Sequence, residues 1–99
     1  MKNVKIKVET EQQNLKVQER VHELNKEAGR TAWIVYLDYG DGYYNFYQGN
    51  DYYRAVCSRW KHYKYLLINK NLNLVIYSDE CDWKKRKEKE VSFDEFMER

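Results

Sequence analysis

The feature that most constrains this sequence is the number of aromatic side chains on a short chain. Ten tyrosines, three tryptophans and three phenylalanines are spread over 99 residues. A domain of this size buries only part of the surface of its unfolded chain, because its surface is large relative to its volume. We therefore expect several rings to face outward. Aromatic residues concentrate binding energy at interfaces, so such rings are expected to form a docking surface.

Length and charge limit the class of protein. The chain is long enough for one domain, 1–99, and its 18 Lys and Arg nearly balance its 16 Asp and Glu. This near-neutral charge favours a folded chain over a disordered one. No apolar run is long enough to span a membrane. The first eight residues alternate charged and apolar side chains and lack the hydrophobic region of a signal peptide, so a cytoplasmic protein is expected.

The N-terminal segment predicts a strand followed by a helix. Three aliphatic residues between positions 4 and 8 alternate with Lys5 and Lys7, which is the period of a half-buried strand. Thr10 and Gln13 then form a capping box, and Gly29 provides a left-handed C-terminal cap. The intervening segment, 11–28, carries one apolar stripe, made of Val17, Val21, Leu24 and Ala28.

The middle of the chain predicts a hairpin and a less certain element. The segments 31–38 and 43–48 are rich in β-branched and aromatic residues and flank the turn 39–42. The spacing of Tyr53, Val56, Cys57 and Trp60 predicts a helix over 51–61. A strand is the alternative there, because Tyr, Val and Trp all favour sheets.

The C-terminal third predicts a second hairpin and a short helix. Strands 63–68 and 72–77 flank the turn 69–71, and the charged segment 78–90 predicts an exposed loop. Ser92 caps a last helical turn that docks through Phe93, Phe96 and Met97.

These elements give the order β-α-β-β-α-β-β-α. The order predicts an α+β fold with two layers, an antiparallel sheet with helices packed on one face, as a ferredoxin-like variant. If 51–61 is a strand, the same pattern predicts a curved antiparallel sheet covered by one helix.

The sequence shows no arrangement typical of an enzyme or a cofactor site. Cys57 and Cys81 are expected to be free thiols, and neither cysteine nor histidine has the spacing of a metal site. The carboxylates of Asp38 and Asp41 flank a turn, which is a wet and convex setting unsuited to acid–base catalysis. Cys57 and His62 have no accompanying oxyanion motif. We therefore expect no enzymatic activity, no cofactor and no metal.

A cluster of aromatic and basic residues is the candidate partner-binding site. It joins tyrosines around the first hairpin to cations that follow them: Tyr39, Tyr43, Tyr44, Tyr47, Tyr52, Tyr53, Arg54, Arg59, Lys61 and Lys64. The stretch 52–78 contains five cations and no acidic residue, so nucleic-acid binding through phosphate contacts and base stacking is the alternative. A pI of about 8.4 is low for a dedicated nucleic-acid binder.

Two segments resemble small accessory proteins of phages and prophages. Residues 17–24, followed by Trp33, resemble the opening of such proteins, and residues 74–79 with 91–96 resemble their ending. The segment 38–61 departs from the pattern, and no functional residue is carried over. The resemblance implies a non-enzymatic protein that binds and inhibits a host protein or ribonucleoprotein complex inside a bacterial cell. Anti-defence and anti-CRISPR proteins are one such class. A small-molecule sponge at a homo-oligomer interface stays open, as does the oligomeric state.

Overall fold

The computed structural model describes residues 3–30, 33–38, 43–48, 63–69, 71, 73–77 and 80–98, with the backbone alone for 33–38 and 43–48. Its elements are β1 (Val4–Lys7), α1 (Glu11–Glu27), β2 (Trp33–Asp38), β3 (Tyr43–Gln48), β4 (Tyr65–Ile68), β5 (Leu74–Tyr77), α3 (Glu80–Lys85), β6 (Lys89–Val91) and α4 (Phe93–Met97).

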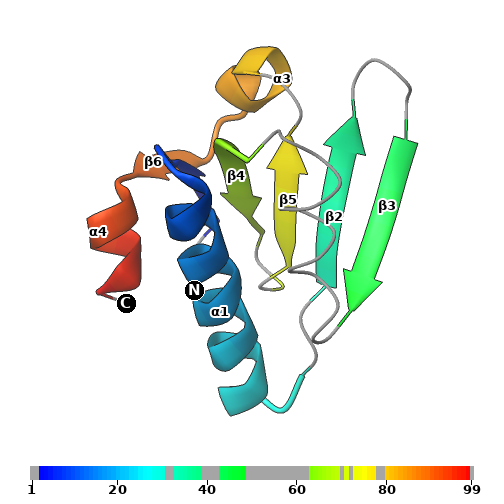
Figure 1. Cartoon of the computed structure of the whole chain (residues 1–99), viewed down its shortest axis with the longest axis vertical. Coiled ribbons are helices and arrows are strands. Elements are labelled where there is room, and N and C mark those ends of the chain that lie inside the picture. The colour runs from blue at the N-terminus through cyan, green and yellow to red at the C-terminus, as the bar shows by residue number, and fades with distance from the viewer. Residues whose placement is uncertain are drawn as a thin grey trace.

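The six strands form one mixed sheet in the order β3-β2-β5-β4-β1-β6 (Figure 1). The pairs β2–β3, β4–β5 and β1–β4 are antiparallel, as expected. The pairs β1–β6 and β2–β5 are parallel, so the expectation of a wholly antiparallel sheet is wrong. The members of each parallel pair are far apart in the sequence, which provides the long connection that parallel neighbours need.

The predicted first helix is confirmed, and its ends have the expected caps. Thr10 Oγ1 accepts a hydrogen bond from the Gln13 N–H (3.2 Å), while Gln13 Oε1 accepts one from the Glu9 N–H (2.7 Å). At the other end, Gly29 has a φ of 73°, and the Arg30 N–H donates to the Asn25 carbonyl (2.8 Å). This is the Schellman arrangement, in which glycine takes the left-handed position.

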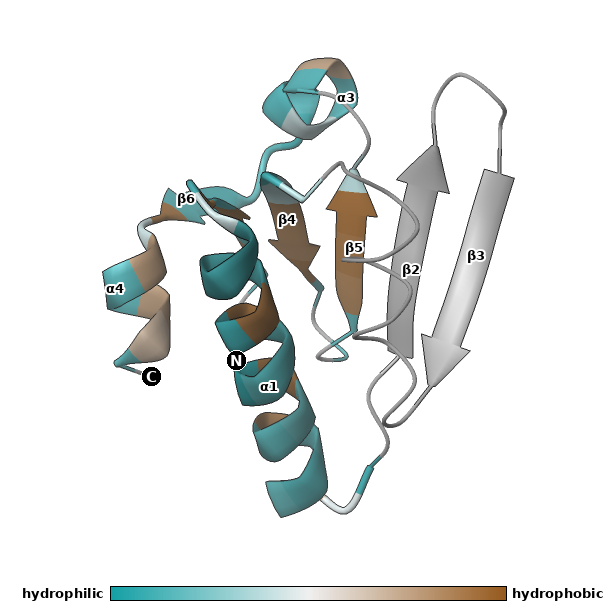
Figure 2. Ribbon diagram, viewed as in Figure 1, coloured by the Kyte–Doolittle hydropathy of each residue, from teal (hydrophilic) through white to brown (hydrophobic). Residues whose placement is uncertain are grey.

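The main core lies between the sheet and the helices α1 and α4, as the predicted two-layer α+β fold requires. The helix α3 packs on the opposite face, so the expectation of helices on one face alone is wrong for α3. The fully buried side chains there come from α1, from α4 and from four strands: Val4, Ile6, Val17, Val21, Leu66, Ile68, Leu74, Ile76, Val91 and Phe96. Figure 2 shows the corresponding hydrophobic colour on β4 and β5, and a hydrophilic outer side on α1. Ala28, expected on the buried stripe, is exposed because it lies past the last turn of α1.

The core side of α1 also carries amides that the sequence pattern did not predict. Asn14, Gln18 and Asn25 are at most 1 % exposed. Asn14 Nδ2 donates to the Tyr63 carbonyl (2.7 Å), Gln18 Nε2 donates to Asn14 Oδ1, and Asn25 Nδ2 donates to the Val21 carbonyl (2.8 Å). These bonds supply partners that buried polar groups need, although Gln18 Oε1 has none among the described residues. The bond from Asn14 to Tyr63 also ties α1 to the segment just before β4.

The C-terminal third confirms two predictions and corrects one. The second hairpin is present, with Asn69 Oδ1 accepting from the N–H groups of Asn71 (2.9 Å) and Asn73 (3.1 Å). Ser92 Oγ caps α4 by accepting from the Glu95 N–H (3.0 Å). The segment 78–90 is not a plain loop, since it contains α3 and the start of β6. The element predicted over 51–61 lies outside the described residues.

Among the described residues, no helix is long and apolar enough to cross a membrane.

Candidate binding surface

The structure describes four of the ten predicted site residues. Tyr43, Tyr44 and Tyr47 lie on β3, where their backbones pair with Asp38, Leu37 and Ile34 of β2. Lys64 lies just before β4 with an exposed side chain, and its carbonyl accepts a hydrogen bond from the Val8 N–H (2.8 Å). The other six lie outside the described residues: Tyr39, Tyr52, Tyr53, Arg54, Arg59 and Lys61.

The two edges of the described sheet differ in length and in charge. β3 forms one edge with six uncharged residues and no proline, four of them aromatic. β6 forms the other edge with three residues, of which Lys89 and Glu90 are charged and exposed. Short strands and charged side chains at an edge prevent pairing with another chain. By this criterion β6 is a protected edge, whereas the sequence of β3 carries neither form of protection.

The aromatic side chains that the structure describes do not form the expected outward surface. Six of the sixteen rings are described, and each is buried or half-buried: Tyr63, Tyr65, Tyr77, Trp83, Phe93 and Phe96. These rings belong to the two hydrophobic clusters that the described side chains form. The expectation of an exposed aromatic surface therefore depends on the ten rings between positions 33 and 60.

A second cluster lies on the face of the sheet opposite α1, and Trp83 anchors it. Trp83 is 3 % exposed and packs with Leu67 and Tyr77, and its ring centroid lies 5.2 Å from that of Tyr65. The indole Nε1–H donates to the Leu66 carbonyl (2.8 Å). A helix as short as α3 is not stable alone. Trp83 therefore holds α3 against the sheet.

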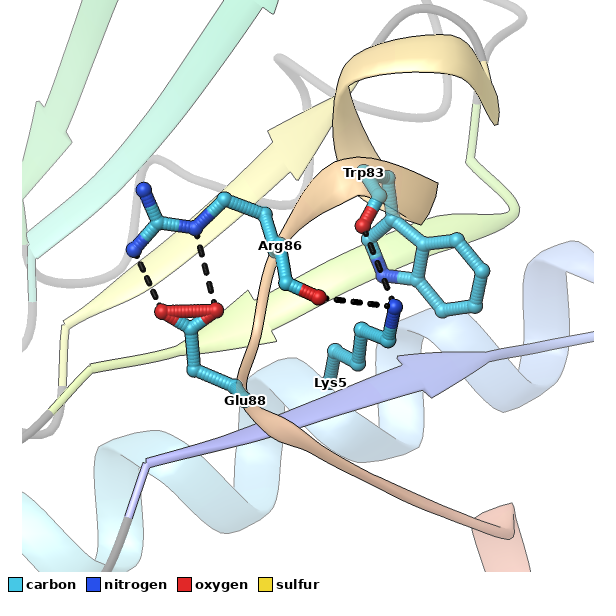
Figure 3. Close-up of polar contacts among 4 residues, drawn as sticks. All are labelled: Lys5, Trp83, Arg86 and Glu88. Carbon is cyan, nitrogen blue, oxygen red and sulfur yellow. Dashed lines mark hydrogen bonds and ion pairs between the residues drawn. The ribbon is translucent and has the colours of Figure 1, made fainter.

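Lys5 links β1 to the end of α3 (Figure 3). Its Nζ donates to the carbonyls of Trp83 (3.3 Å), Lys84 (3.2 Å) and Arg86 (3.2 Å) and lies 4.6 Å from the Trp83 ring centroid. All three ammonium donors thus have an acceptor, which explains how this side chain tolerates being only 8 % exposed. The cation also neutralises the negative end of the α3 dipole.

Tyr65 and Glu80 form a polar contact beside this cluster. The Tyr65 hydroxyl donates to Glu80 Oε2 (2.7 Å), and Lys84 Nζ lies 3.5 Å from Glu80 Oε1. The hydrogen bond from Tyr65 lowers the pKa of Glu80, and the nearby Lys84 and Lys7 act in the same direction. The same hydrogen bond, together with burial and the negative charge of Glu80, raises the pKa of Tyr65.

Replacing Tyr65 by phenylalanine is expected to change the pH dependence of stability at both ends. The pKa of Glu80 is lowered from 4.5, so its stabilising contribution is present above that pH and is lost as the pH falls through the folded-state pKa. The pKa of Tyr65 is raised from 10.0, so its contribution is present below that pH and is lost as the pH rises through the folded-state pKa. The difference in Tm between wild type and Tyr65→Phe should therefore be largest near neutral pH.

Thermal unfolding measured from acid to alkaline pH checks this expectation. Tyr63→Phe is the matched control, because it removes a hydroxyl from another half-buried tyrosine. A Tm difference for Tyr65→Phe that stays constant across the pH range would contradict the assignment of the Tyr65–Glu80 contact.

The last turn of α3 and the two residues after it form a basic corner, which we define as Lys84, Lys85, Arg86 and Lys87. The Arg86 guanidinium donates through Nε to Glu88 Oε2 (3.0 Å) and through Nη2 to Glu88 Oε1, as Figure 3 shows. This forked pair lowers the pKa of Glu88 and raises that of Arg86. An open depression of about 290 Å³ is lined by Lys85, Arg86, Lys87 and Glu88.

The sequence interpretation missed α3, although its sequence carried a signal. The first turn is acidic, with Glu80 and Asp82, and the last turn is basic, with Lys84 and Lys85, which complements a helix dipole. A single tryptophan in an otherwise charged segment is the second signal, because it marks the side that packs.

The described residues contain no group of three or more His, Cys, Asp or Glu that could hold a metal ion. Cys81 is exposed and is not in a disulfide, and Cys57 and His62 lie outside the described residues. The chain matches no family model, no curated protein and no solved structure.

Proposed function

We propose that this protein is a non-enzymatic binding protein that inhibits a host protein or ribonucleoprotein complex by occupying its surface. The setting would be the cytoplasm of a bacterial cell, with the protein acting as a phage or prophage accessory protein of the anti-defence or anti-CRISPR type. The tyrosine-rich segment around β3 would make the contact, with the cations that follow it at the rim.

The observation that carries this proposal is the nature of the β3 edge. β3 has β2 as its partner in the described sheet, and its sequence combines three tyrosines and a phenylalanine with no charge. An uncharged edge strand is a template for pairing with another chain. Strand addition supplies backbone hydrogen bonds, and aromatic side chains supply the anchors that dominate interface energies. The segment β3 combines an edge for strand addition with aromatic side chains that can act as anchors.

The proposal is tested by capturing partners from bacterial lysate with three forms of the tagged protein. The triple variant Tyr43→Thr, Tyr44→Thr, Tyr47→Thr removes the tyrosines and keeps residues that favour strands. The control Asn45→Thr, Gln48→Thr changes the same strand at two non-aromatic positions. We expect mass spectrometry to find a protein that wild type and control retain and the triple variant loses. Capture that is equal for all three forms would contradict the proposal.

The second candidate function is nucleic-acid binding through the segment 52–78. It is favoured by the exposed side chain of Lys64, which lies between the half-buried Tyr63 and Tyr65. Phosphate contacts release counterions, so this function predicts an affinity for nucleic acid that falls steeply with salt. A gel shift at two salt concentrations tests it, and the absence of a shift at low salt would remove it.

A further inference from the structure

We propose that the basic corner at the end of α3 is a binding site for the phosphate backbone of duplex nucleic acid. This site is separate from the tyrosines of β3 and does not depend on them. It also lies outside the segment 52–78. The basic corner is therefore a third surface, different from those of both functions proposed above.

The charge of the corner favours a bound anion. All four cations of the corner are exposed, and the Lys84 side chain is 75 % exposed. Among the described residues, two carboxylates contact them: Glu88 pairs with Arg86, and Glu80 lies 3.5 Å from Lys84 in an exposed pair. Exposed pairs of the second kind are weak and do not hold a lysine in place. The ammonium groups of Lys84, Lys85 and Lys87 are thus available to an anion.

The C-terminal end of α3 lies at this corner. The C-terminal end of a helix carries partial negative charge, which normally repels an anion. Here the carbonyls of Trp83, Lys84 and Arg86 are turned onto the buried ammonium of Lys5. That contact neutralises the repulsive end and places a further positive charge beneath the corner. Lys5 therefore makes the end of α3 compatible with a bound anion.

The shape of the corner suits an extended ligand. The depression there is open and is lined by four residues with long charged side chains, Lys85, Arg86, Lys87 and Glu88. The cations follow one another along the chain at 84–87. A row of flexible cations on an open surface suits an extended polyanion, which gains affinity by releasing one counterion for each phosphate contacted.

The chemistry of the four cations favours phosphate over carboxylate. Arginine binds a carboxylate best through a two-pronged fork, and the Nε and Nη2 atoms of Arg86 already make that contact with Glu88. The remaining cations are lysines, which act as point charges and serve well for phosphates. An acidic protein segment would find the Nε–Nη2 fork of Arg86 already occupied.

The lack of an exposed ring on α3 favours a duplex over a single strand. Binding of single strands relies on exposed aromatic rings that stack with the bases. The one aromatic residue of α3, Trp83, is 3 % exposed and lies under Lys5. Without a stacking ring, the higher charge density of a duplex is the dominant attraction. Binding should be independent of base sequence, because the phosphates carry no sequence information.

The test is a fluorescence-anisotropy titration of a short labelled DNA duplex over a range of salt concentrations. The corner variant is Lys84→Gln, Lys85→Gln, Lys87→Gln. The matched control is Lys16→Gln, Lys26→Gln, Arg30→Gln, which removes the same charge from exposed positions on and just after α1. A further variant, Arg54→Gln, Arg59→Gln, Lys61→Gln, tests the segment 52–78. Urea unfolding confirms that each variant is folded.

A plot of log affinity against log salt concentration has a negative slope, to which each phosphate contact with a duplex contributes about 0.9. Loss of three contacts should therefore reduce the magnitude of this slope by about 2.7. We expect this loss in the corner variant and an unchanged slope in the control. The inference is overturned if the wild type does not bind the duplex at about 50 mM salt. It is also overturned if the α1 control or the 52–78 variant loses as much affinity for the duplex as the corner variant does. Tighter binding of labelled polyglutamate than of the duplex to the wild-type protein would overturn it as well.

Discussion

Replacing Trp83 by alanine is expected to lower the free energy of unfolding by about 3–5 kcal/mol, which is a large part of the stability of a domain of this size. The indole is 3 % exposed, donates a hydrogen bond to the Leu66 carbonyl and packs on Leu67 and Tyr77. Its removal leaves a cavity, and this face of the sheet loses the side chain that covers Leu67 and Tyr77. Because α3 is six residues long, we also expect it to lose its helical structure when the anchor is removed.

Urea unfolding followed by circular dichroism measures this effect. Lys85→Ala is the matched control, since it changes an exposed residue of the same helix and should alter the free energy of unfolding by less than about 0.5 kcal/mol. Trp83→Phe should fall between wild type and alanine, because it keeps a ring and loses the N–H donor. A change of less than about 1 kcal/mol for Trp83→Ala would contradict the anchoring role.

Replacing Lys5 by methionine is expected to lower the free energy of unfolding by about 2 kcal/mol. Methionine keeps an unbranched side chain of similar length but removes the ammonium donor from three carbonyls at the end of α3. The Trp83 carbonyl keeps the Arg86 N–H (3.1 Å), whereas those of Lys84 and Arg86 lose the Lys5 donor, and an unpaired buried acceptor costs about 1–3 kcal/mol. The gain from no longer burying a charge offsets part of this cost. The expected net loss is therefore below the sum of three lost hydrogen bonds.

Lys7→Met provides the control for this measurement. Lys7 is two residues away on the same strand and on the same face, but its side chain is exposed. Its replacement should change the free energy of unfolding by less than about 0.5 kcal/mol. Equal effects of the two substitutions would show that Lys5 does not cap α3. The double variant Lys5→Met, Trp83→Ala should be less destabilised than the sum of the single variants, because the two side chains share one contact.

The elements with local signals were predictable from the sequence. The caps at Thr10, Gly29 and Ser92 act over a few residues, so their residue types identify the ends of α1 and the start of α4. The hairpin at Asn69 was predictable for the same reason, because its asparagine bonds the backbone of the turn itself. Local chemistry of this kind does not require knowledge of the tertiary fold.

The features that depend on distant contacts were not predictable. Lys5 alternates with apolar residues, and this pattern predicts a solvated side chain, yet a helix about 80 residues later in the chain covers it. The parallel pairs β1–β6 and β2–β5 likewise join distant segments, so no turn sequence indicates them. The basic corner is visible in the sequence as a run of cations. Its relation to Lys5 and Glu88 required the fold.

The central claim is that the tyrosines of β3 carry the contact with a protein partner. Isothermal titration calorimetry with the purified partner, at low and at high salt, tests it most directly. If Tyr43, Tyr44 and Tyr47 are the anchors, their replacement by threonine should weaken binding by at least about 30-fold, as loss of an interface hot spot does. The same account predicts that raising the salt concentration changes the wild-type affinity much less. Unchanged affinity in the tyrosine variant, with binding that salt abolishes, would contradict it.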